Sequence, residues 1–138
     1  MKAQDLMLGD WVYGIDGKGG KHPCRINAVD IYPQNRTPRV VTSGGYGYQQ
    51  ENLEPIPLTP DILEKNGFEK QGFEGWLLPF GTKPENGLIL WRTDYGTPHL
   101  MIESYSSKYG DFRSFGIQYA HELQHALRLC WIDKEIVI

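Results

Sequence analysis

Five consecutive residues near the end of the chain have the types and the spacing of a zinc-protease helix. The run His121-Glu122-Leu123-Gln124-His125 matches the pattern H-E-x-x-H. Histidines four apart on a helix can both bind one zinc ion, and the glutamate between them can act as general base toward the metal-bound water. The sequence therefore offers one catalytic hypothesis, a zinc hydrolase with His121 and His125 as ligands and Glu122 as the base.

The residues around this motif argue against that hypothesis. A catalytic zinc needs a third protein ligand, and the extended metalloprotease pattern would place glycine and histidine where this chain has Arg128 and Trp131. Arg128 also shares a side of the helix with His125, and its charge would repel a dication. A third ligand from upstream would be unusual in chain order; the candidates are His22, His99, Glu103 and Asp111. We therefore expect no cofactor, with zinc as the alternative.

The motif lies in the only segment with a clear helical period and without glycine or proline, Tyr119 to Trp131. At about 100° per residue, its apolar side chains gather on one face, while His121 and His125 gather on the opposite face. We predict a helix over residues 117–131, with Leu123 and Leu127 in the core.

Upstream of this helix, the sequence is typical of short strands separated by turns. The strand candidates are Trp11–Tyr13, Cys24–Ile31, Arg39–Thr42, Phe73–Phe80, Leu88–Thr93 and Pro98–Ser104. The turn signal Asp94-Tyr95-Gly96 predicts antiparallel pairing of the last two candidates. We expect residues 14–23, which are rich in glycine and charge, to form a mobile loop. The apolar run Glu135–Ile138 predicts a final strand, or a segment that lies against the helix.

A short helix is predicted in the middle of the chain. Prolines make residues 54–58 extended, which we interpret as a linker across the surface. Thr59 is suited to cap the helix that Pro60 begins, and Gly67 is suited to end it. Phe68 is expected to pack back onto this helix.

Together these patterns predict an α+β fold with two subdomains. Residues 1–55 are expected to form an SH3-like small β-barrel or a bent sheet. Residues 56–138 are expected to form an antiparallel sheet packed against one C-terminal helix, with a C-terminal strand. Fold analogy of this kind gives no information about the ligand.

The charge of the chain argues against nucleic acid as its partner. The formal net charge is -3 and the pI is about 5.8, so a broad basic field for phosphate backbones is missing. The basic residues that cluster at all are Lys18, Lys21, Arg25, Arg36 and Arg39. Because glycine and proline interrupt this cluster, we interpret it as a solvated loop.

Cysteine usage and hydropathy predict a soluble cytoplasmic protein. Cys24 and Cys130 lie far apart in the sequence, and the start of the chain has no apolar signal-peptide core. No apolar run is long enough to cross a bilayer, so we expect no membrane partner. Neither cysteine nor any serine lies in a motif that would activate a nucleophile.

Aromatic residues are the remaining binding candidates. Tyr46 and Tyr48 are two positions apart, which would place both rings on one face of a strand, as a stacking platform or as a cross-strand pair. The tryptophans are interpreted as core and interface residues: Trp11, Trp76, Trp91 and Trp131. One exposed tryptophan would instead mark a site for a partner.

Three short motifs occur in order along most of the chain. They are L-x-x-G-[DN]-x-V in residues 6–12, P-I-x-L-T-x-x-x-L-x-x-x-G-F in residues 55–68, and Y-x-H-x-L-Q in residues 119–124. In these motifs the chain resembles a family of small uncharacterised proteins found in gut-bacterial genomes and their prophages. The resemblance implies no activity, since none is assigned to the family.

The resemblance also bears on the helix motif. In many members of that family, the positions that match Glu122 and His125 are glutamine and asparagine. The shared element is then H-x-L-Q, which implies a structural role for His121 and Gln124, such as hydrogen bonding to a neighbouring strand.

From these observations we expect a non-enzymatic soluble binding or adaptor protein of phage or mobile-element origin, with a protein partner. A zinc-dependent hydrolase is the first alternative, and a weak nucleic-acid-binding module is the second. The oligomeric state is left open.

Overall fold

The computed structural model describes residues 5–30, 38–72, 75–79, 87–93, 99–104 and 116–138. The chain divides into two compact units, residues 1–57 with 119–121 and residues 58–118 with 122–138. The predicted division between residues 55 and 56 did not anticipate that Tyr119–His121 groups with the first unit.

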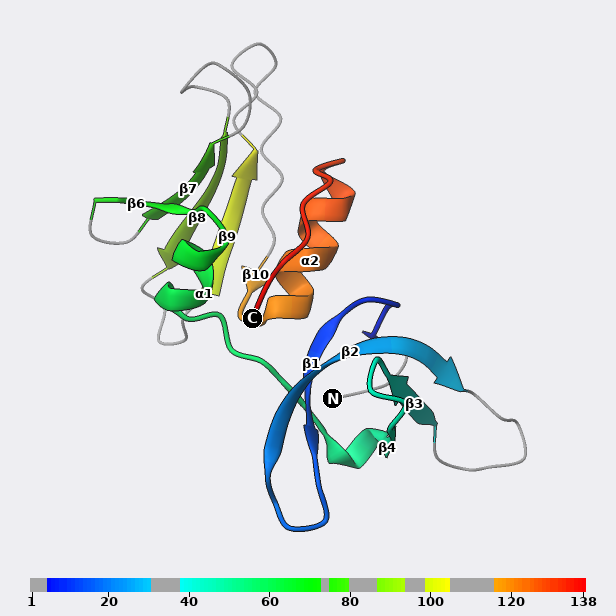
Figure 1. Ribbon diagram of the computed structural model, residues 1–138. Helices are drawn as coiled ribbons and strands as arrows, with labels where there is room; N and C mark the ends of the chain where they lie inside the picture. The colour runs from blue at the N-terminus through cyan, green and yellow to red at the C-terminus, as the bar shows by residue number, and fades with distance from the viewer. Residues whose placement is uncertain (1–4, 31–37, 73–74, 80–86, 94–98, 105–115) are drawn as a thin grey trace. The chain divides into compact units, whose positions relative to one another are not determined.

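The first unit is a five-stranded antiparallel sheet in the order β4-β3-β2-β1-β5 (Figure 1). Its elements are β1 (Trp11–Ile15), β2 (Lys21–Asp30), β3 (Arg39–Thr42), β4 (Gly47–Gln49), the 3-10 helix η2 (Gln50–Asn52) and β5 (Leu53–Pro55). β4 and β5 are its two edges, so the hydrogen bonds among the described strands do not close a barrel. The bent-sheet form of the prediction is confirmed.

The bend lies in β2, which serves both halves of this sheet. Residues 21–25 pair with β1, residues 26–30 pair with β3, and the register shifts between Ile26 and Ala28. Such an irregularity bends a strand and increases its twist. The core of the unit consists of buried apolar side chains: Leu6, Val12, Ile26, Val40 and Leu53.

The turn that leads into β1 depends on a buried carboxylate. Asp10 is 0% exposed, and its Oδ2 accepts a hydrogen bond from the Met7 amide at 2.7 Å. Gly9 has a φ of 84°, which glycine adopts readily, and its amide donates to the carbonyl of Ile26. Leu6 on one side of this turn and Val12 on the other enter the core. Each specified position of the opening motif therefore has a structural role.

The predicted surface linker at residues 54–58 is wrong. Residues 53–55 form β5, which pairs with β1. Ile56 is 0% exposed, and its carbonyl accepts a hydrogen bond from the Ala120 amide at 2.9 Å. Proline is tolerated here because β5 is an edge strand, where a missing amide donor breaks no ladder.

The second unit contains another five-stranded antiparallel sheet, in the order β10-β9-β8-β7-β6 (Figure 1). Its strands are β6 (Glu69–Gln71), β7 (Gly75–Pro79), β8 (Gly87–Thr93), β9 (His99–Ser104) and β10 (Gly116–Ile117). The predicted pairing of β8 with β9 is confirmed, from Leu88 opposite Ser104 to Thr93 opposite His99. β6 was not predicted, because its three residues are polar and all exposed.

Helix α1 (Pro60–Lys65) follows its sequence signals. The Thr59 hydroxyl accepts a hydrogen bond from the Ile62 amide at 3.3 Å, and Gly67 has a φ of 78°. Phe68 is buried, and its amide donates to the carbonyl of Leu63 at 3.0 Å. The prediction that Phe68 packs back beyond the helix stop is confirmed.

Helix α2 (Ala120–Leu129) is shorter than the predicted span of residues 117–131. It starts later because residues 116–117 pair with β9 as β10. The carboxylate of Glu122 accepts a hydrogen bond from the Gln118 amide at 2.7 Å, as acidic side chains often do in the first turn of a helix. No helix in the described part of the chain is long and apolar enough to cross a membrane.

The predicted C-terminal strand is not formed, since residues 132–138 have no strand assignment. The amide group of Asn66 instead makes two hydrogen bonds to the backbone of Val137, one from Nδ2 to the carbonyl at 2.7 Å and one from the Val137 amide to Oδ1 at 2.8 Å. A side chain thus supplies the hydrogen bonds that a neighbouring strand would have supplied.

Replacing Asp10 with alanine is expected to lower the free energy of unfolding by about 1–3 kcal/mol, because the Met7 amide loses the buried carboxylate that accepts its hydrogen bond. Urea unfolding followed by tryptophan fluorescence measures this. The control is Asp5→Ala, which removes an exposed carboxylate and should change the free energy by less than about 0.5 kcal/mol. Equal effects of the two substitutions would contradict the role given to Asp10.

Candidate functional site

The histidine motif on α2 is more deeply buried than the helical pattern predicted. His121 is 7% exposed and Gln124 is 4% exposed, so the prediction that His121 lies on the solvent-facing side is wrong. The His121 ring stacks on Tyr119, with 5.9 Å between the ring centroids and an angle of 11° between the planes. The buried face of the helix is wide enough to include Leu123, Leu127 and these polar residues. A structural role for His121 and Gln124 requires that both side chains are buried, and both are.

The structure does not gather the other parts of a zinc site. Glu122, the proposed general base, caps the helix at the Gln118 amide. No group of three or more histidine, cysteine, aspartate or glutamate side chains within metal-binding reach occurs among the described residues. Of the candidate third ligands, His22 pairs with Asp16, His99 and Glu103 lie on β9, and Asp111 lies outside the described residues.

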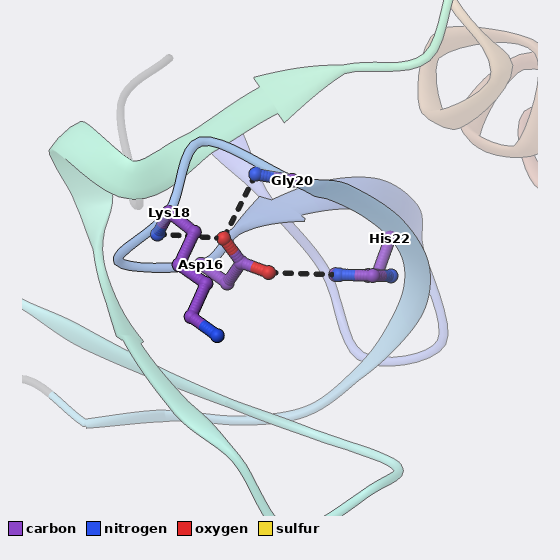
Figure 2. Close-up of polar contacts among 4 residues, drawn as sticks. All are labelled: Asp16, Lys18, Gly20 and His22. Atoms are coloured by element: carbon purple, nitrogen blue, oxygen red, sulfur yellow. Dashed lines mark hydrogen bonds and ion pairs between the residues drawn. The ribbon is translucent and has the colours of Figure 1, made fainter.

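The predicted loop over residues 14–23 is too long, because residues 14–15 belong to β1 and residues 21–23 belong to β2. The connection between the two strands is a tight turn organised by Asp16. Oδ1 of Asp16 accepts hydrogen bonds from the amides of Lys18 and Gly20, each at 2.8 Å (Figure 2). Oδ2 lies 3.1 Å from Nε2 of His22. These contacts lower the pKa of the Asp16 carboxyl, with the Gly20 amide as the largest cause and His22 as the second.

Three of the basic residues that were predicted to cluster make contacts within the first unit. Lys21 forms an ion pair with Glu54. Arg25 lies over the Trp11 ring at 5.6 Å from its centroid and donates from Nε to the carbonyl of Gly9 at 3.3 Å. Arg39 lies against Gly47, and Arg36 is outside the described residues. The contacts of these described basic residues give no support to the nucleic-acid alternative.

Tyr46 and Tyr48 do not form the predicted pair on one face of a strand. Tyr46 lies in the turn before β4 and is 69% exposed. The Tyr48 ring lies over Gly14, where a Cβ atom would come within 2.5 Å of it. Glycine at position 14 is therefore what allows Tyr48 to pack against β1.

Cys24 lacks the electrostatics of a nucleophile. It is half-buried, and its Sγ donates to the carbonyl of Val12 at 3.6 Å. Burial raises the pKa of the thiol, which lowers the fraction of reactive thiolate at neutral pH.

The end of α2 has a tryptophan where helices usually have glycine. The Ile132 amide donates to the carbonyl of Leu127 at 2.9 Å, and the Trp131 amide donates to the carbonyl of Arg128 at 3.1 Å, which is the Schellman arrangement. Trp131 has a φ of 58°, the only positive φ of a non-glycine residue among those described. For a bulky residue this conformation is unfavourable.

The Trp131 side chain projects into solvent. It is 95% exposed, and Leu129, two residues earlier, is 60% exposed. The prediction that Trp131 belongs to the core is therefore wrong, and the condition for a partner site, one exposed tryptophan, is met. No sequence signal indicated this turn, because position 131 has neither the glycine nor the asparagine that usually marks a left-handed cap.

Searches with the chain against protein-family models, curated proteins and solved structures returned no match. The resemblance to the gut-bacterial and prophage family stays a prediction. The candidate site is accordingly defined by geometry, and we name the exposed pair Leu129 and Trp131 the C-cap patch.

Lowering the pH should remove the contribution of Asp16 to the turn. Its pKa is lowered in the folded state, so the contribution is complete above the ordinary aspartate pKa of about 4 and is lost as the pH falls through the lowered value. Titration of the Asp16 carboxyl by NMR measures this. His22→Gln should return the pKa part of the way, and an ordinary pKa in the unsubstituted chain would contradict the turn.

Trp131→Gly should give a more stable chain than Trp131→Ala, by about 1 kcal/mol, because glycine adopts the left-handed conformation without strain. Urea unfolding compares the two. The matched control is Leu129, inside the helix, where alanine should be the more stable by about 1 kcal/mol. The same order at both positions would contradict strain at Trp131.

Proposed function

We propose that this protein is a non-enzymatic binding protein that engages another protein through the C-cap patch. The observation that supports the proposal is that Trp131 is 95% exposed while its backbone adopts a conformation that glycine would adopt more easily. An exposed indole contributes little to the fold, and the left-handed backbone costs about 1–2 kcal/mol. Folding alone therefore does not explain this residue.

A tryptophan at this position has the properties of a binding hot spot. It is the largest apolar side chain, it has few rotatable bonds, and its Nε1–H can donate one directed hydrogen bond. Tryptophan is enriched among the few interface residues that contribute most of the binding energy. Leu129, two residues earlier in the chain, is a second exposed apolar side chain. The partner expected is a protein with an apolar slot that contains a hydrogen-bond acceptor.

The other candidate functions have no comparable support among the described residues. Glu122 is used as a helix cap, and Lys21 and Arg25 make contacts within the first unit. A phage or mobile-element origin rests on the resemblance of the three motifs.

Paired affinity capture tests the proposal. The unsubstituted chain, Trp131→Ala, Trp131→Gly and Tyr46→Ala are used as baits in a lysate of the organism that encodes the chain, with quantification by mass spectrometry. We expect a protein that is retained by the unsubstituted chain and by Tyr46→Ala, and depleted about tenfold or more by both Trp131 variants. Tyr46→Ala is the matched control, since it removes an exposed aromatic ring from the other unit.

A direct measurement on the captured protein completes the test. Burial of the Trp131 indole should shift its fluorescence to shorter wavelength and protect it from acrylamide quenching. Equal retention by all four baits, or an indole that stays accessible in the complex, would refute the proposal.

A further inference from the structure

The C-terminal segment, residues 132–138, is held by a clamp that recognises backbone. Nδ2 of Asn66 donates to the Val137 carbonyl at 2.7 Å, and Oδ1 of Asn66 accepts from the Val137 amide at 2.8 Å. Nζ of Lys65 donates to the Ile138 carbonyl at 2.7 Å. These contacts use no atom of the Val137 or Ile138 side chain, so the clamp fits any extended chain placed there.

One side chain anchors the segment in this clamp. Ile136 is 1% exposed, whereas Val137 is 47% exposed. Asn66 itself is 4% exposed, and its Nδ2 is also fixed on the Ile62 carbonyl at 2.7 Å. The clamp is therefore built into the end of α1, independently of the segment it holds.

The segment reaches the clamp only through the left-handed residue at the end of α2. The chain leaves α2 at Leu129, reverses at Trp131 and returns to α1 (Figure 1). In the closed chain, the contacts of residues 132–138 with Asn66 are made with Trp131 at a φ of 58°. A chain that opened at this residue would release the strain of the left-handed conformation.

We propose that residues 132–138 exchange between two copies of this chain, so that the segment of each copy occupies the Asn66 clamp of the other. A second copy brings an identical segment, so the exchanged state makes the same hydrogen bonds and buries the same Ile136 anchor. The closed state needs the left-handed turn, whereas the exchanged state does not. A short hinge under strain is the situation that favours exchange of a terminal segment.

The exchange is independent of the proposed function. It depends on the backbone conformation of residue 131, whereas binding of another protein depends on the indole. Trp131→Ala removes the indole and keeps the strain, so it should lose the captured protein and retain the exchange. Failure of one proposal therefore leaves the other standing.

Two substitutions at the hinge should act in opposite directions. Proline fixes φ near -65°, so Trp131→Pro excludes the left-handed turn and should increase the dimer fraction. Trp131→Gly removes the strain of the closed form and should raise the dimer dissociation constant about tenfold relative to the unsubstituted chain. Size-exclusion chromatography with light scattering over micromolar to millimolar concentrations measures both. Shifts in the same direction, or monomers throughout, would overturn the proposal.

Complementation tests the exchange without changing the hinge. Asn66→Ala breaks the clamp and keeps an intact segment, whereas Ile136→Asp breaks the segment and keeps an intact clamp. Neither variant can form a complete contact alone, but a mixed dimer contains one intact clamp with one intact segment. We expect dimers only after mixing, with a gain in helical circular dichroism if either variant is partly unfolded. Monomers after mixing would overturn the proposal even if Trp131→Pro failed to fold.

Discussion

The left-handed residue that ends α2 is the constraint on which much of the second unit depends. Trp131 reverses the chain, and this reversal allows Ile136 to be buried and Val137 to meet the side chain of Asn66. An unfavourable backbone conformation is retained only when the surrounding contacts outweigh it. Here those contacts are a Schellman pair of hydrogen bonds and a backbone clamp. The backbone conformation of Trp131 therefore determines how readily residues 132–138 can leave the Asn66 clamp.

Elements with local signals were predictable from the sequence, and elements fixed by distant contacts were not. Helix α1 carries its cap and its stop within a few residues, and β8 and β9 are joined by a recognisable turn signal. By contrast, residues 135–138 have the apolar composition of a strand, but no strand in the described part of the chain pairs with them. Instead Asn66, which is distant in the sequence, forms the hydrogen bonds to the Val137 backbone. The period of a sequence shows which residues are apolar. It does not show which distant polar side chain will form hydrogen bonds with the backbone of a segment.

Predictions about the candidate site likewise succeeded where the signal is local and failed where tertiary contacts decide. The helical period correctly placed Leu123 and Leu127 in the core, but it placed His121 on the wrong side because the buried face of α2 is wider than one apolar stripe. Glu122 in the H-E-x-x-H run is explained by its position in the first turn, where a carboxylate can accept a backbone amide. A motif of five residues specifies spacing, whereas a metal site also requires ligands that only the tertiary structure can bring together.

Trp131 combines two properties that usually belong to different residues, a left-handed turn and an exposed indole. A glycine at position 131 would satisfy the turn, and a tryptophan placed within the helix would expose an indole without strain. Combining both at the point of reversal ties the direction of the indole to the closed state of the segment, since Ile132 is already bonded back to Leu127. The turn and the exposed indole thus meet in one residue, although segment exchange depends on the backbone conformation of residue 131 and partner binding depends on its side chain.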